Sequence, residues 1–272
     1  MDPGTPVLTE ADLCAGFRRL GISEGDAMMA HSSLSAFGWV EGGAEAVITA
    51  LLRVLGPGGT LAMPTLCQKD KERRFETWDI HNSPSDVGRI TETLRLWPGA
   101  LRSDHATHSV AALGPLAEEI TSGHATAYGR PGPWGPAAFG HGSPWDRFYQ
   151  LNVLYCFLGV SFRVNTMRHY CQSRLVEDAL AQARPQARQG LLDRLAGWNK
   201  PGVWPHYNGE PMEARLAERG LIAYVEIGRA TCRSLRARTM VDNILQVLRA
   251  RPEEWFDGAF MEWWGEALSV EH

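Results

Sequence analysis

One stretch constrains the fold more than any other, an apolar run that leads directly into a helical pattern. Residues 152–160 read NVLYCFLGV, and residues 161–175 read SFRVNTMRHYCQSRL. A short apolar run without alternation is typical of a strand that is buried on both faces. Asn165 is a good helix N-cap, after which residues 166–175 can continue as a helix. The sequence therefore predicts a strand, a turn and a helix of an α/β protein.

His169 lies four residues after this expected cap, on the same helix face as Asn165. Sheets of α/β proteins usually carry their reactive groups just past the carboxyl ends of the strands. A titratable imidazole at this place predicts a general base. On this segment alone, the alternative is a packed or surface histidine without a chemical role.

Composition narrows the class of protein. The chain has 272 residues, of which 44% are hydrophobic and 21% are charged, with a formal net charge of −4. These values describe an ordinary globular protein, and the slight acidity argues against nucleic acid as a partner. Because the sequence shows no apolar run of membrane-spanning length and no leader, we expect a cytoplasmic protein that does not bind membranes. The five cysteines lack close spacing and are expected to be reduced thiols.

The rest of the chain mixes strand and helix patterns. Strands are expected at 27–31, 59–65, 108–114 and 221–227, and helices at 9–20, 43–55, 85–97, 115–122, from 143 onward and at 234–251. Residues 182–215 are polar and contain many Pro and Gly, and we interpret them as a segment that covers the active face. No repeat or linker divides the chain, so one domain of mixed α/β build over residues 1–272 is the simplest outcome.

Two loops have the composition of a ligand site. Residues 31–40, HSSLSAFGWV, bring three hydroxyls and several free backbone N–H groups to the end of a strand, which suits a phosphate or the amide chain of pantetheine. Arg102, Ser103 and His105 precede the strand at 108–114, and arginine matches phosphate oxygens in a bidentate way. Each pattern also occurs in simple solvated loops.

Tryptophans are numerous in the irregular parts of the chain. Four of them, which could line a cleft, are Trp134, Trp145, Trp198 and Trp204. The irregular segment 123–142 is long, and long loops in compact domains tend to be functional. Loop packing is the alternative explanation for these rings.

Five motifs are specific when taken together. They read HSSLSAFGWV at 31–40, GPGGTLAMPT at 56–65, RSDHATHSVAALG at 102–114, GSP at 142–144, and FLGV followed by NTxxH within 157–169. With these motifs the chain resembles the aminoglycoside 3-N-acetyltransferase family over about residues 13–248. The resemblance implies a single-domain, three-layer α/β/α sandwich around a central mixed sheet. It also implies an acyltransferase that moves an acetyl group from acetyl-CoA to an amine.

The resemblance also implies roles for individual residues. The CoA-binding residues would be His31, Ser32, Ser33, Leu34, Ser35, Arg102, Ser103, Ser109 and Val110. His169 matches the histidine that takes the proton from the attacking amine. His31 matches a histidine at the mouth of the CoA loop, and Glu92 matches a family carboxylate that orients a histidine. We therefore expect His169, Glu92 and His31 to be catalytic, acetyl-CoA to be the co-substrate, and no metal to take part.

The chemistry of amide formation agrees with these roles. An amine that is protonated at neutral pH cannot attack a thioester until it loses a proton, and a histidine with a pKa near ~6.5 suits that task. The developing oxyanion needs a donor, such as a loop N–H or a serine hydroxyl. We expect direct transfer without an acetyl-enzyme. Cys171 is the alternative nucleophile, but at i+2 on a helix it faces away from His169.

The sequence departs from the family pattern at the expected acceptor site. Many members carry a His-Asp pair where Phe162 and Arg163 stand, and a glutamate where Gln172 stands. Aminoglycosides are polycations that are usually held by carboxylates, so these changes should weaken their binding by roughly a few kcal/mol. The residues that we expect around the acceptor are Asp79, Arg163, Asn165 and Gln172. Acids that could compensate are Asp70, Asp79, Asp86 and Glu177.

Several alternatives stay open at this point. The acceptor is an aminoglycoside or, alternatively, a less cationic amine of natural-product metabolism. A metal hydrolase could use His31, His105, His108 and His169, although no HxH or HxxxH pair stands beside clustered carboxylates. A binding protein that kept the fold and lost turnover is a third class. The small-molecule amine is the expected partner, and a homodimer is compatible with the sequence.

Overall fold

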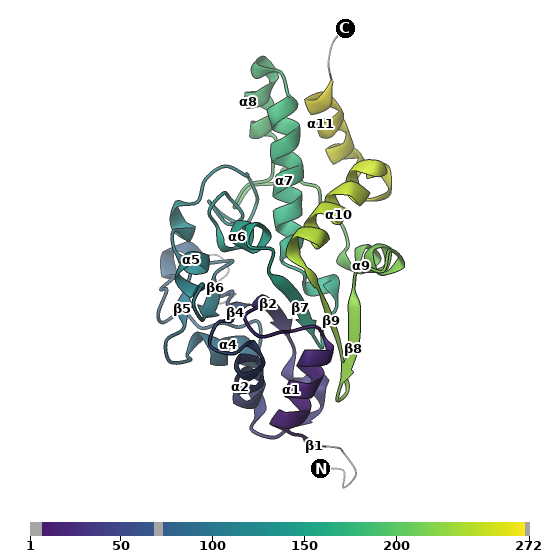
Figure 1. Cartoon of the computed structure of the whole chain (residues 1–272). Coiled ribbons are helices and arrows are strands. Elements are labelled where there is room, and N and C mark those ends of the chain that lie inside the picture. Colours follow the sequence, from purple (N-terminus) through teal and green to yellow (C-terminus); the bar gives the residue numbers. More distant parts are fainter. Residues whose placement is uncertain (1–6, 68–72, 270–272) are drawn as a thin grey trace.

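A mixed seven-stranded sheet runs through the centre of the molecule in the order β5-β6-β4-β2-β7-β9-β8 (Figure 1). The computed structural model describes residues 7–67 and 73–269. The strands of this sheet are β2 (Ala27–Ser32), β4 (Thr60–Pro64), β5 (Leu101–Arg102), β6 (Val110–Leu113), β7 (Leu154–Leu158), β8 (Ala223–Ile227) and β9 (Ala230–Arg236). A separate parallel pair consists of β1 (Val7–Leu8) and β3 (Trp39–Val40).

Strand β7 lies inside this sheet. All five of its residues are buried, as the apolar run at 152–160 predicts. It pairs in parallel with β2, which pairs in parallel with β4, whereas β6 runs antiparallel to β4. The register sets Ser32 beside Leu158 and Pro64 beside Val110. The carboxyl ends of β2, β4 and β7 and the start of β6 therefore lie at one edge of the sheet, where α/β proteins bind their ligands.

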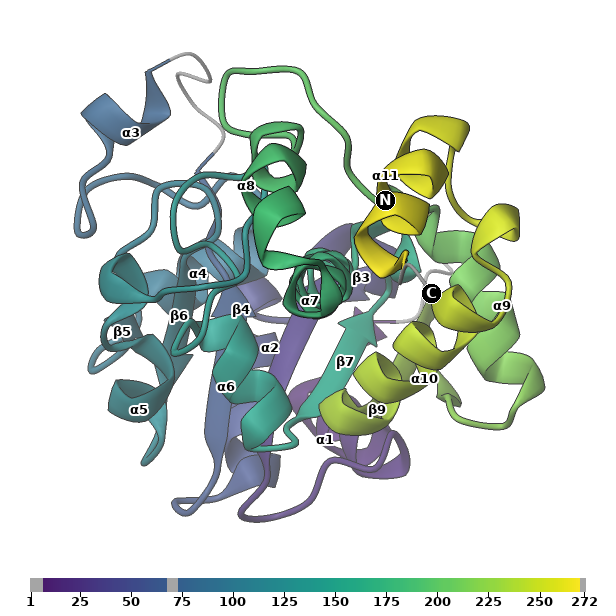
Figure 2. The same cartoon turned by 90° about the horizontal axis from the view of Figure 1, so that it is seen from above.

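Helices cover both faces of the sheet, which confirms the predicted α/β/α sandwich (Figures 1 and 2). The helices on one face are α1 (Glu10–Arg19), α2 (Gly43–Leu55) and α4 (Arg89–Arg95). Those on the other face include α5 (Ala117–Thr121), α6 (Pro144–Gln150), α7 (Met167–Gln182) and α10 (Ala237–Ala250). The sheet separates two apolar cores, because alternate residues of each strand point to opposite faces: Met28 packs into one core and Met29 into the other.

Local signals in the sequence set several helix ends. At the start of α1, Thr9 Oγ1 accepts from the Asp12 N–H at 3.3 Å, and Asp12 Oδ2 accepts from the Thr9 N–H at 3.0 Å. At the start of α6, Ser143 Oγ accepts from the Asp146 N–H, and Pro144 occupies the first turn. Both helix starts are confirmed. No helix within residues 7–67 and 73–269 has the length and apolar character that crossing a membrane requires.

The helix predicted at 234–251 begins three residues late, because residues 230–236 form strand β9. This strand pairs antiparallel with β7. Three of its four buried positions, Ala230, Cys232 and Ser234, are small, so they carry little of the apolar and β-branched pattern that marks a strand. Pairing with β7, rather than local preference, decides that this segment is a strand.

The helix predicted at 85–97 also begins late, at Arg89. Gly88 precedes it with a φ of 139°, a conformation that glycine adopts readily. The Ser85 N–H donates to Glu92 Oε2 at 2.7 Å, so residues 85–88 approach the helix in an irregular path. Helices that the sequence pattern does not reveal are α3 (Arg74–Thr77), α8 (Pro185–Asp193), α9 (Gly209–Glu218) and α11 (Gly258–Leu268).

Candidate active site

Two histidines lie near the ligand-binding edge of the sheet, without a contact between their rings among the described residues. His31 lies near the carboxyl end of β2, and His169 lies in the first turn of α7, which follows β7. The Thr166 N–H points at His31 Nε2 at 3.4 Å, and the His169 N–H donates to Thr166 O at 3.0 Å. Both histidines therefore contact the same residue at the start of α7.

The helix start differs from the prediction in one detail. Thr166, not Asn165, is the N-cap of α7, and no side-chain cap bond is formed there. Asn165 instead ends a short 3-10 turn, η3 (Phe162–Val164), and its Nδ2 contacts Met240 Sδ at 3.6 Å. The expected capping role of Asn165 is therefore wrong. The helix still places His169 in its first turn, because the N-cap moves by only one residue.

A chain of neutral hydrogen bonds fixes the proton of His169. The Trp204 indole N–H, which can only donate, bonds to Gln172 Oε1 at 3.1 Å. The same oxygen lies 3.0 Å from His169 Nδ1, so Nδ1 must be the donor. Nδ1 therefore carries the hydrogen, and the lone pair of the neutral ring lies on Nε2. The hydrogen-bond acceptor of this ring is therefore Nε2, and the role of His169 as a general base stays a prediction.

Aromatic rings surround this base. The ring centroid of Trp134 lies 3.8 Å from that of His169, and those of Phe139 and His108 lie at 5.6 and 5.8 Å. Trp134 comes from the long loop before α6 and lies 5.6 Å from Trp204. Two of the loop tryptophans that could line a cleft therefore meet beside the base. Trp204 belongs to the segment at 182–215 that is predicted to cover the active face, and its contacts agree with that interpretation.

The environment keeps His169 neutral. Its pKa is lowered to about 3, first by burial and then by the charge of Arg168, with a smaller contribution from His206. The hydrogen bond to Gln172 opposes this shift. The imidazole is therefore unprotonated at neutral pH, the form that can accept a proton, but a pKa this low makes it a weaker base than the ordinary histidine that the sequence leads us to expect.

Three more histidines form a neutral cluster next to His169. The Thr107 hydroxyl donates to Trp134 O at 2.7 Å, so it accepts from His108 Nδ1 at 2.8 Å, and the lone pair of His108 lies on Nε2. The rings of His105 and His124 stack at 4.6 Å. Burial is the main cause that lowers the pKa of all three. The lining of the site beside β6 is therefore polar but uncharged.

His31 is held by an aromatic hydroxyl. Tyr155 Oη accepts from the Met167 N–H at 3.3 Å and donates to His31 Nε2 at 2.8 Å. The His31 ring also stacks on Phe157 at 5.5 Å. Burial lowers the pKa of His31 to about 3, so this imidazole is neutral as well. Its Nε2 is engaged by protein groups, and a catalytic role for His31 stays a prediction.

A groove of about 760 Å³ opens beside the predicted CoA loop. Its lining includes Ser32, Ser33, Leu34, Ser35, Gly42, Gly43, Val87, Gly88 and Arg89. A narrower cavity of about 200 Å³ shares Ser32 and Val87 with this groove and extends to His31 and Thr166. The Ser32 hydroxyl is buried without a hydrogen-bond partner in the described chain. The groove therefore leads from the surface to the start of the helix that carries His169.

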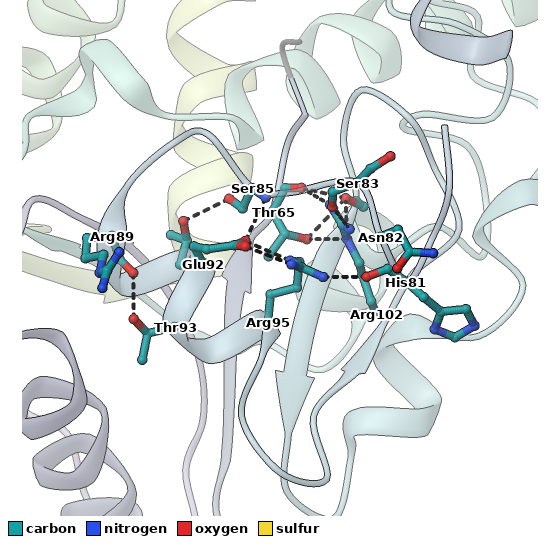
Figure 3. Close-up of polar contacts among 12 residues, drawn as sticks. Thr65, His81, Asn82, Ser83, Ser85, Arg89, Glu92, Thr93, Arg95 and Arg102 are labelled. Atoms are coloured by element: carbon teal, nitrogen blue, oxygen red, sulfur yellow. Dashed lines mark hydrogen bonds and ion pairs between the residues drawn. The ribbon is translucent and has the colours of Figure 1, made fainter. Parts of the chain in front are cut away.

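Arg102 has a structural role in this geometry (Figure 3). Its guanidinium donates to Thr65 O at 2.6 Å and to Ser83 O at 2.5 Å, and it lies over the Trp78 ring at 4.4 Å. Burial lowers the pKa of Arg102 to about 10, and the group stays charged at neutral pH. These contacts fasten the loop before α4 to the end of β4.

The other three residues of the second predicted CoA loop are interior. Ser103, Ser109 and Val110 have no exposed surface, and Ser109 Oγ donates to Thr65 O at 2.8 Å. None of them lines the groove beside β2, and Arg102 lines a different hollow of about 560 Å³. The structure therefore does not bring this loop and the 31–35 loop to one surface, and its role in CoA binding stays a prediction.

Glu92 contacts an arginine instead of the expected histidine (Figure 3). Its two oxygens accept from Arg95 Nε and Nη2, both at 2.7 Å, and Oε2 also accepts from the Ser85 N–H. Arg95 in turn donates to His81 O at 2.7 Å. Within the described residues, the carboxylate bonds to no imidazole. In this geometry, Glu92 positions the segment that ends at Val87, and Val87 lines the groove.

The residues that we expect around the acceptor do not gather in one place. Asp79 is exposed and closes a turn, since its Oδ1 accepts two backbone N–H groups at 2.8 and 2.9 Å. Arg163 is exposed on η3, and Asn165 is buried against Met240. Of the four, Gln172 alone bonds to His169 among the described contacts. The expected acceptor set is therefore reduced to Gln172 by this geometry.

Two of the four acids proposed as compensation, Asp79 and Glu177, are engaged elsewhere. Glu177 bonds to Arg130 Nε and His141 Nε2, both at 3.0 Å. Asp70 lies outside the described residues.

The burial of Cys171 does not match a covalent route, and the contacts of the histidines do not match the four-histidine metal site. Cys171 has no exposed surface, and burial raises the pKa of its thiol to about 12, which disfavours the nucleophilic thiolate. His31 stacks on Phe157, whereas His108 lies against His169. In the part of the chain that the structure describes, no group of three or more His, Cys, Asp or Glu side chains is placed to hold a metal ion.

Comparison with known proteins decides the family. The model of the aminoglycoside 3-N-acetyltransferase family matches residues 29–249, most of the chain. The chain belongs to the aminoglycoside 3-N-acetyltransferase family. Aminoglycoside N(3)-acetyltransferase III of Salmonella sp. is 33% identical over an alignment of 183 residues, and the match covers 61% of this chain and 60% of that protein. This match therefore spans about 60% of the length of the relative.

Solved structures of the family share the fold. The apoenzyme of aminoglycoside acetyltransferase AAC(3)-IVa aligns with a TM-score of 0.73 at 26% identity, covering 93% of each chain. The structure of AAC-IIIb in a binary complex with CoASH aligns with a TM-score of 0.68 at 23% identity, covering 90% of this chain and 98% of that one. The sheet and both helix layers are therefore those of this family.

Several residues of the candidate site could not be identified from the sequence alone. Tyr155 sits inside the apolar strand, where nothing in the pattern shows that its hydroxyl bonds to His31. Arg168 is next to the base, yet a single arginine on a helix is usually a surface residue. The bond from Trp204 to Gln172 joins positions 32 residues apart. The placement of Trp204 in a loop rich in Pro and Gly is the one signal that could suggest it.

Proposed function

We propose that this chain transfers an acetyl group from acetyl-CoA to an amino group of an aminoglycoside, with His169 as the general base. The observation that carries this proposal is the fixed tautomer of His169, which leaves the lone pair on Nε2. The residue lies in the first turn of α7, the helix that follows β7. Family membership supports the reaction type, and the relatives' names support an aminoglycoside as the acceptor. The identity of the acceptor is the part that most needs a test.

The groove beside β2 is the proposed site for acetyl-CoA. Its volume of about 760 Å³ lies in the range of pockets that hold cofactor-sized ligands. The hydroxyls of Ser32, Ser33 and Ser35 can bond to the amides of a pantetheine arm, and Arg89 supplies a positive charge for a phosphate. The narrow cavity beyond Ser32 gives the thioester end a path toward the start of α7.

The proposed reaction is a direct transfer. The amine nitrogen attacks the thioester carbonyl carbon, and His169 Nε2 removes a proton from that nitrogen as the N–C bond forms. The C–S bond then breaks, and the thiolate of CoA receives the proton. The buried, protonated thiol of Cys171 supports a mechanism without an acetyl-enzyme.

A second acceptor class is favoured by one observation. The orienting partner of His169 is the neutral amide of Gln172, where many family members carry a glutamate. A carboxylate at this position would favour a charged imidazolium and a cationic acceptor, whereas an amide favours neither. A less cationic amine is therefore the alternative to an aminoglycoside.

The test is acetyl transfer by the purified chain, followed as release of free CoA thiol. We expect turnover of acetyl-CoA with an amine acceptor, and a loss of about 10²–10⁴-fold in kcat for His169→Gln. The control Cys171→Ala should keep the parent rate, because its thiol takes no part. Turnover that survives in His169→Gln, or an acetylated cysteine trapped by mass spectrometry, would refute the mechanism.

A further inference from the structure

One buried arginine fastens the loop that carries Trp134 to helices α6 and α7. Arg130 is 8% exposed, and its guanidinium donates to Asp146 Oδ1 at 2.5 Å and to Glu177 Oε2 at 3.0 Å. Asp146 belongs to α6 and Glu177 to α7, so the arginine joins both helices to the loop. The guanidinium also lies over the Tyr170 ring at 4.5 Å, and the Tyr170 hydroxyl donates to Asp146 Oδ1 at 2.9 Å. Charge-assisted bonds of this kind fix both the position and the orientation of an arginine.

The backbone at Arg130 is strained. Its φ is 27°, a value that residues other than glycine rarely adopt. The Arg130 N–H donates to Glu177 Oε1 at 3.2 Å, and the preceding Gly129 allows this approach, since a Cβ there would lie 2.9 Å from the same oxygen. A strained backbone persists only where its surroundings hold it, and such positions gather at functional sites. The bonds of Arg130 therefore hold the loop in a conformation that it would not keep alone.

A short, stiff segment connects Arg130 to the base. Residues 130–134 read RPGPW, so two prolines with a fixed φ lie between Arg130 and Trp134. The Trp134 ring lies 3.8 Å from the His169 ring, and Trp134 O accepts from the Thr107 hydroxyl at 2.7 Å. Trp134 is therefore held from two directions, by Arg130 from the side of α7 and by Thr107 from the segment before β6. A shift of Arg130 should be transmitted to the ring that lies on His169.

The orientation of His169 depends on this ring. Its Nδ1 donates to Gln172 Oε1 at 3.0 Å, which fixes one atom of the imidazole. The contact with Trp134 fixes the plane of the ring, and with it the direction in which the Nε2 lone pair points. A reacting group that is misplaced by about 1 Å can lose on the order of 10²-fold in rate.

Resting on the role of His169 proposed above, we propose that Arg130 is a positioning residue for acetyl transfer. Through Asp146 and Glu177 it holds the loop so that Trp134 stays against the imidazole. The groove beside β2 and the narrow cavity beyond it contain none of these residues. Loss of Arg130 should therefore slow the chemical step without weakening the binding of acetyl-CoA.

The experiment measures acetyl transfer to kanamycin by Arg130→Met and Arg130→Lys. Methionine removes the charge, whereas lysine keeps the charge but lacks the forked geometry of the guanidinium. We expect kcat to fall by about 10- to 100-fold in Arg130→Met and by less in Arg130→Lys, with KM for acetyl-CoA unchanged in both. The matched control Arg249→Met removes an exposed arginine that pairs with Asp178 of α7, and it should leave both constants unchanged.

A second substitution covers the case in which Arg130→Met does not fold, since it leaves two carboxylates without their partner. Glu177→Gln weakens the same bonds at a side chain that is 30% exposed, so it costs less stability. It should lower kcat severalfold with KM for acetyl-CoA unchanged.

An activity-independent readout is modification of His169 by diethyl pyrocarbonate, which acylates a free imidazole nitrogen and is located by mass spectrometry. Displacing Trp134 should make His169 react severalfold faster in Arg130→Met and in Glu177→Gln than in the parent. It should leave the rate unchanged in Arg249→Met. The exposed His81 is the internal reference and should react equally in all variants.

The inference requires both results, a lower kcat at constant KM and faster modification of His169. If either is absent from the variants that fold, or if KM for acetyl-CoA rises together with the loss of kcat, the inference is overturned. A parent protein that acetylates no amine would count against the proposed function instead. In that case the rate of His169 modification alone decides whether Arg130 holds Trp134 on the imidazole.

Discussion

The two halves of the candidate site are built in different ways. The groove beside β2 is lined on one side by a single stretch, residues 32–43, and on the other by residues 87–89. The surroundings of His169 come from loops and helices that are far apart in the chain, with contributions from His108, Trp134 and Trp204. The first half follows from local sequence, and that sequence matches the family. The second half depends on tertiary packing, and there the chain departs from the family in both charge and hydrogen bonding.

Acid pH should destabilise the surroundings of His169 more than the groove beside β2. This loss of stability is the largest effect that we expect. A histidine whose pKa is lowered in the folded state contributes stability that is present above about pH 6.5 and is lost as the pH falls toward the folded value. His31 and His169, whose pKa is lowered to about 3, should each cost about 1.4 kcal/mol between pH 7.5 and 5.5. Burial lowers the pKa of His105, His108 and His124 as well, so these histidines add to the loss in the same direction.

Urea unfolding followed by tryptophan fluorescence at both pH values measures this loss. Three of the five histidines cluster next to His169, so a decrease of several kcal/mol is expected. His124→Gln should reduce the pH dependence by about one histidine's share, whereas the exposed control His81→Gln should not change it. Equal free energies of unfolding at pH 7.5 and 5.5 would contradict the prediction.

A carboxylate at position 172, beside His169, should make this part of the site resemble the family pattern. Gln172→Glu keeps an acceptor oxygen for Trp204 and places a negative charge next to His169 Nδ1, which favours the imidazolium form. We expect the rising limb of the pH–rate profile to move to higher pH by about 1–2 units. The exposed Gln182→Glu, at the end of the same helix, is the control. An unchanged profile in Gln172→Glu would mean that residue 172 does not tune the base.

On the groove side, Glu92→Gln separates a positioning role from a catalytic one. The substitution removes the bidentate ion pair with Arg95 and weakens the bond to Ser85, so the wall at Val87 should become less ordered. We expect KM for acetyl-CoA to rise about tenfold with kcat nearly unchanged, since only binding is affected. If kcat falls instead and KM stays constant, Glu92 takes part in the chemical step as the family resemblance implies.

The smallest effect is expected at the rim of the groove. Arg89→Gln removes an exposed positive charge, which should weaken CoA binding by about three- to fivefold at low salt and by less at high salt. Arg53→Gln, an exposed arginine of α2 that pairs with Glu10, is the matched control. Isothermal titration with CoA at two salt concentrations measures both variants. A loss that does not depend on salt would argue against a phosphate contact at Arg89.

Local sequence was sufficient for much of the fold. The apolar run that becomes β7, the capping box at Thr9, the Ser143-Pro144 helix start and the helix at 43–55 each depend on residues close in the chain. By contrast, β9 and the late start of α4 could not be predicted. Pairing with β7 decides the first, and the bond from Ser85 to Glu92 accompanies the second.

By itself, the sequence determined the α/β class, the helix that carries His169, and the loop at 31–40 that lines the groove. The tertiary structure alone decided which nitrogen of His169 carries the proton, because the donor that settles it is Trp204, which lies 32 residues beyond its partner Gln172 in the chain. It also decided that Arg102 and Glu92 hold a loop in place. A side chain's partners are set by which elements pack together, and that information is not present in the local pattern of residues.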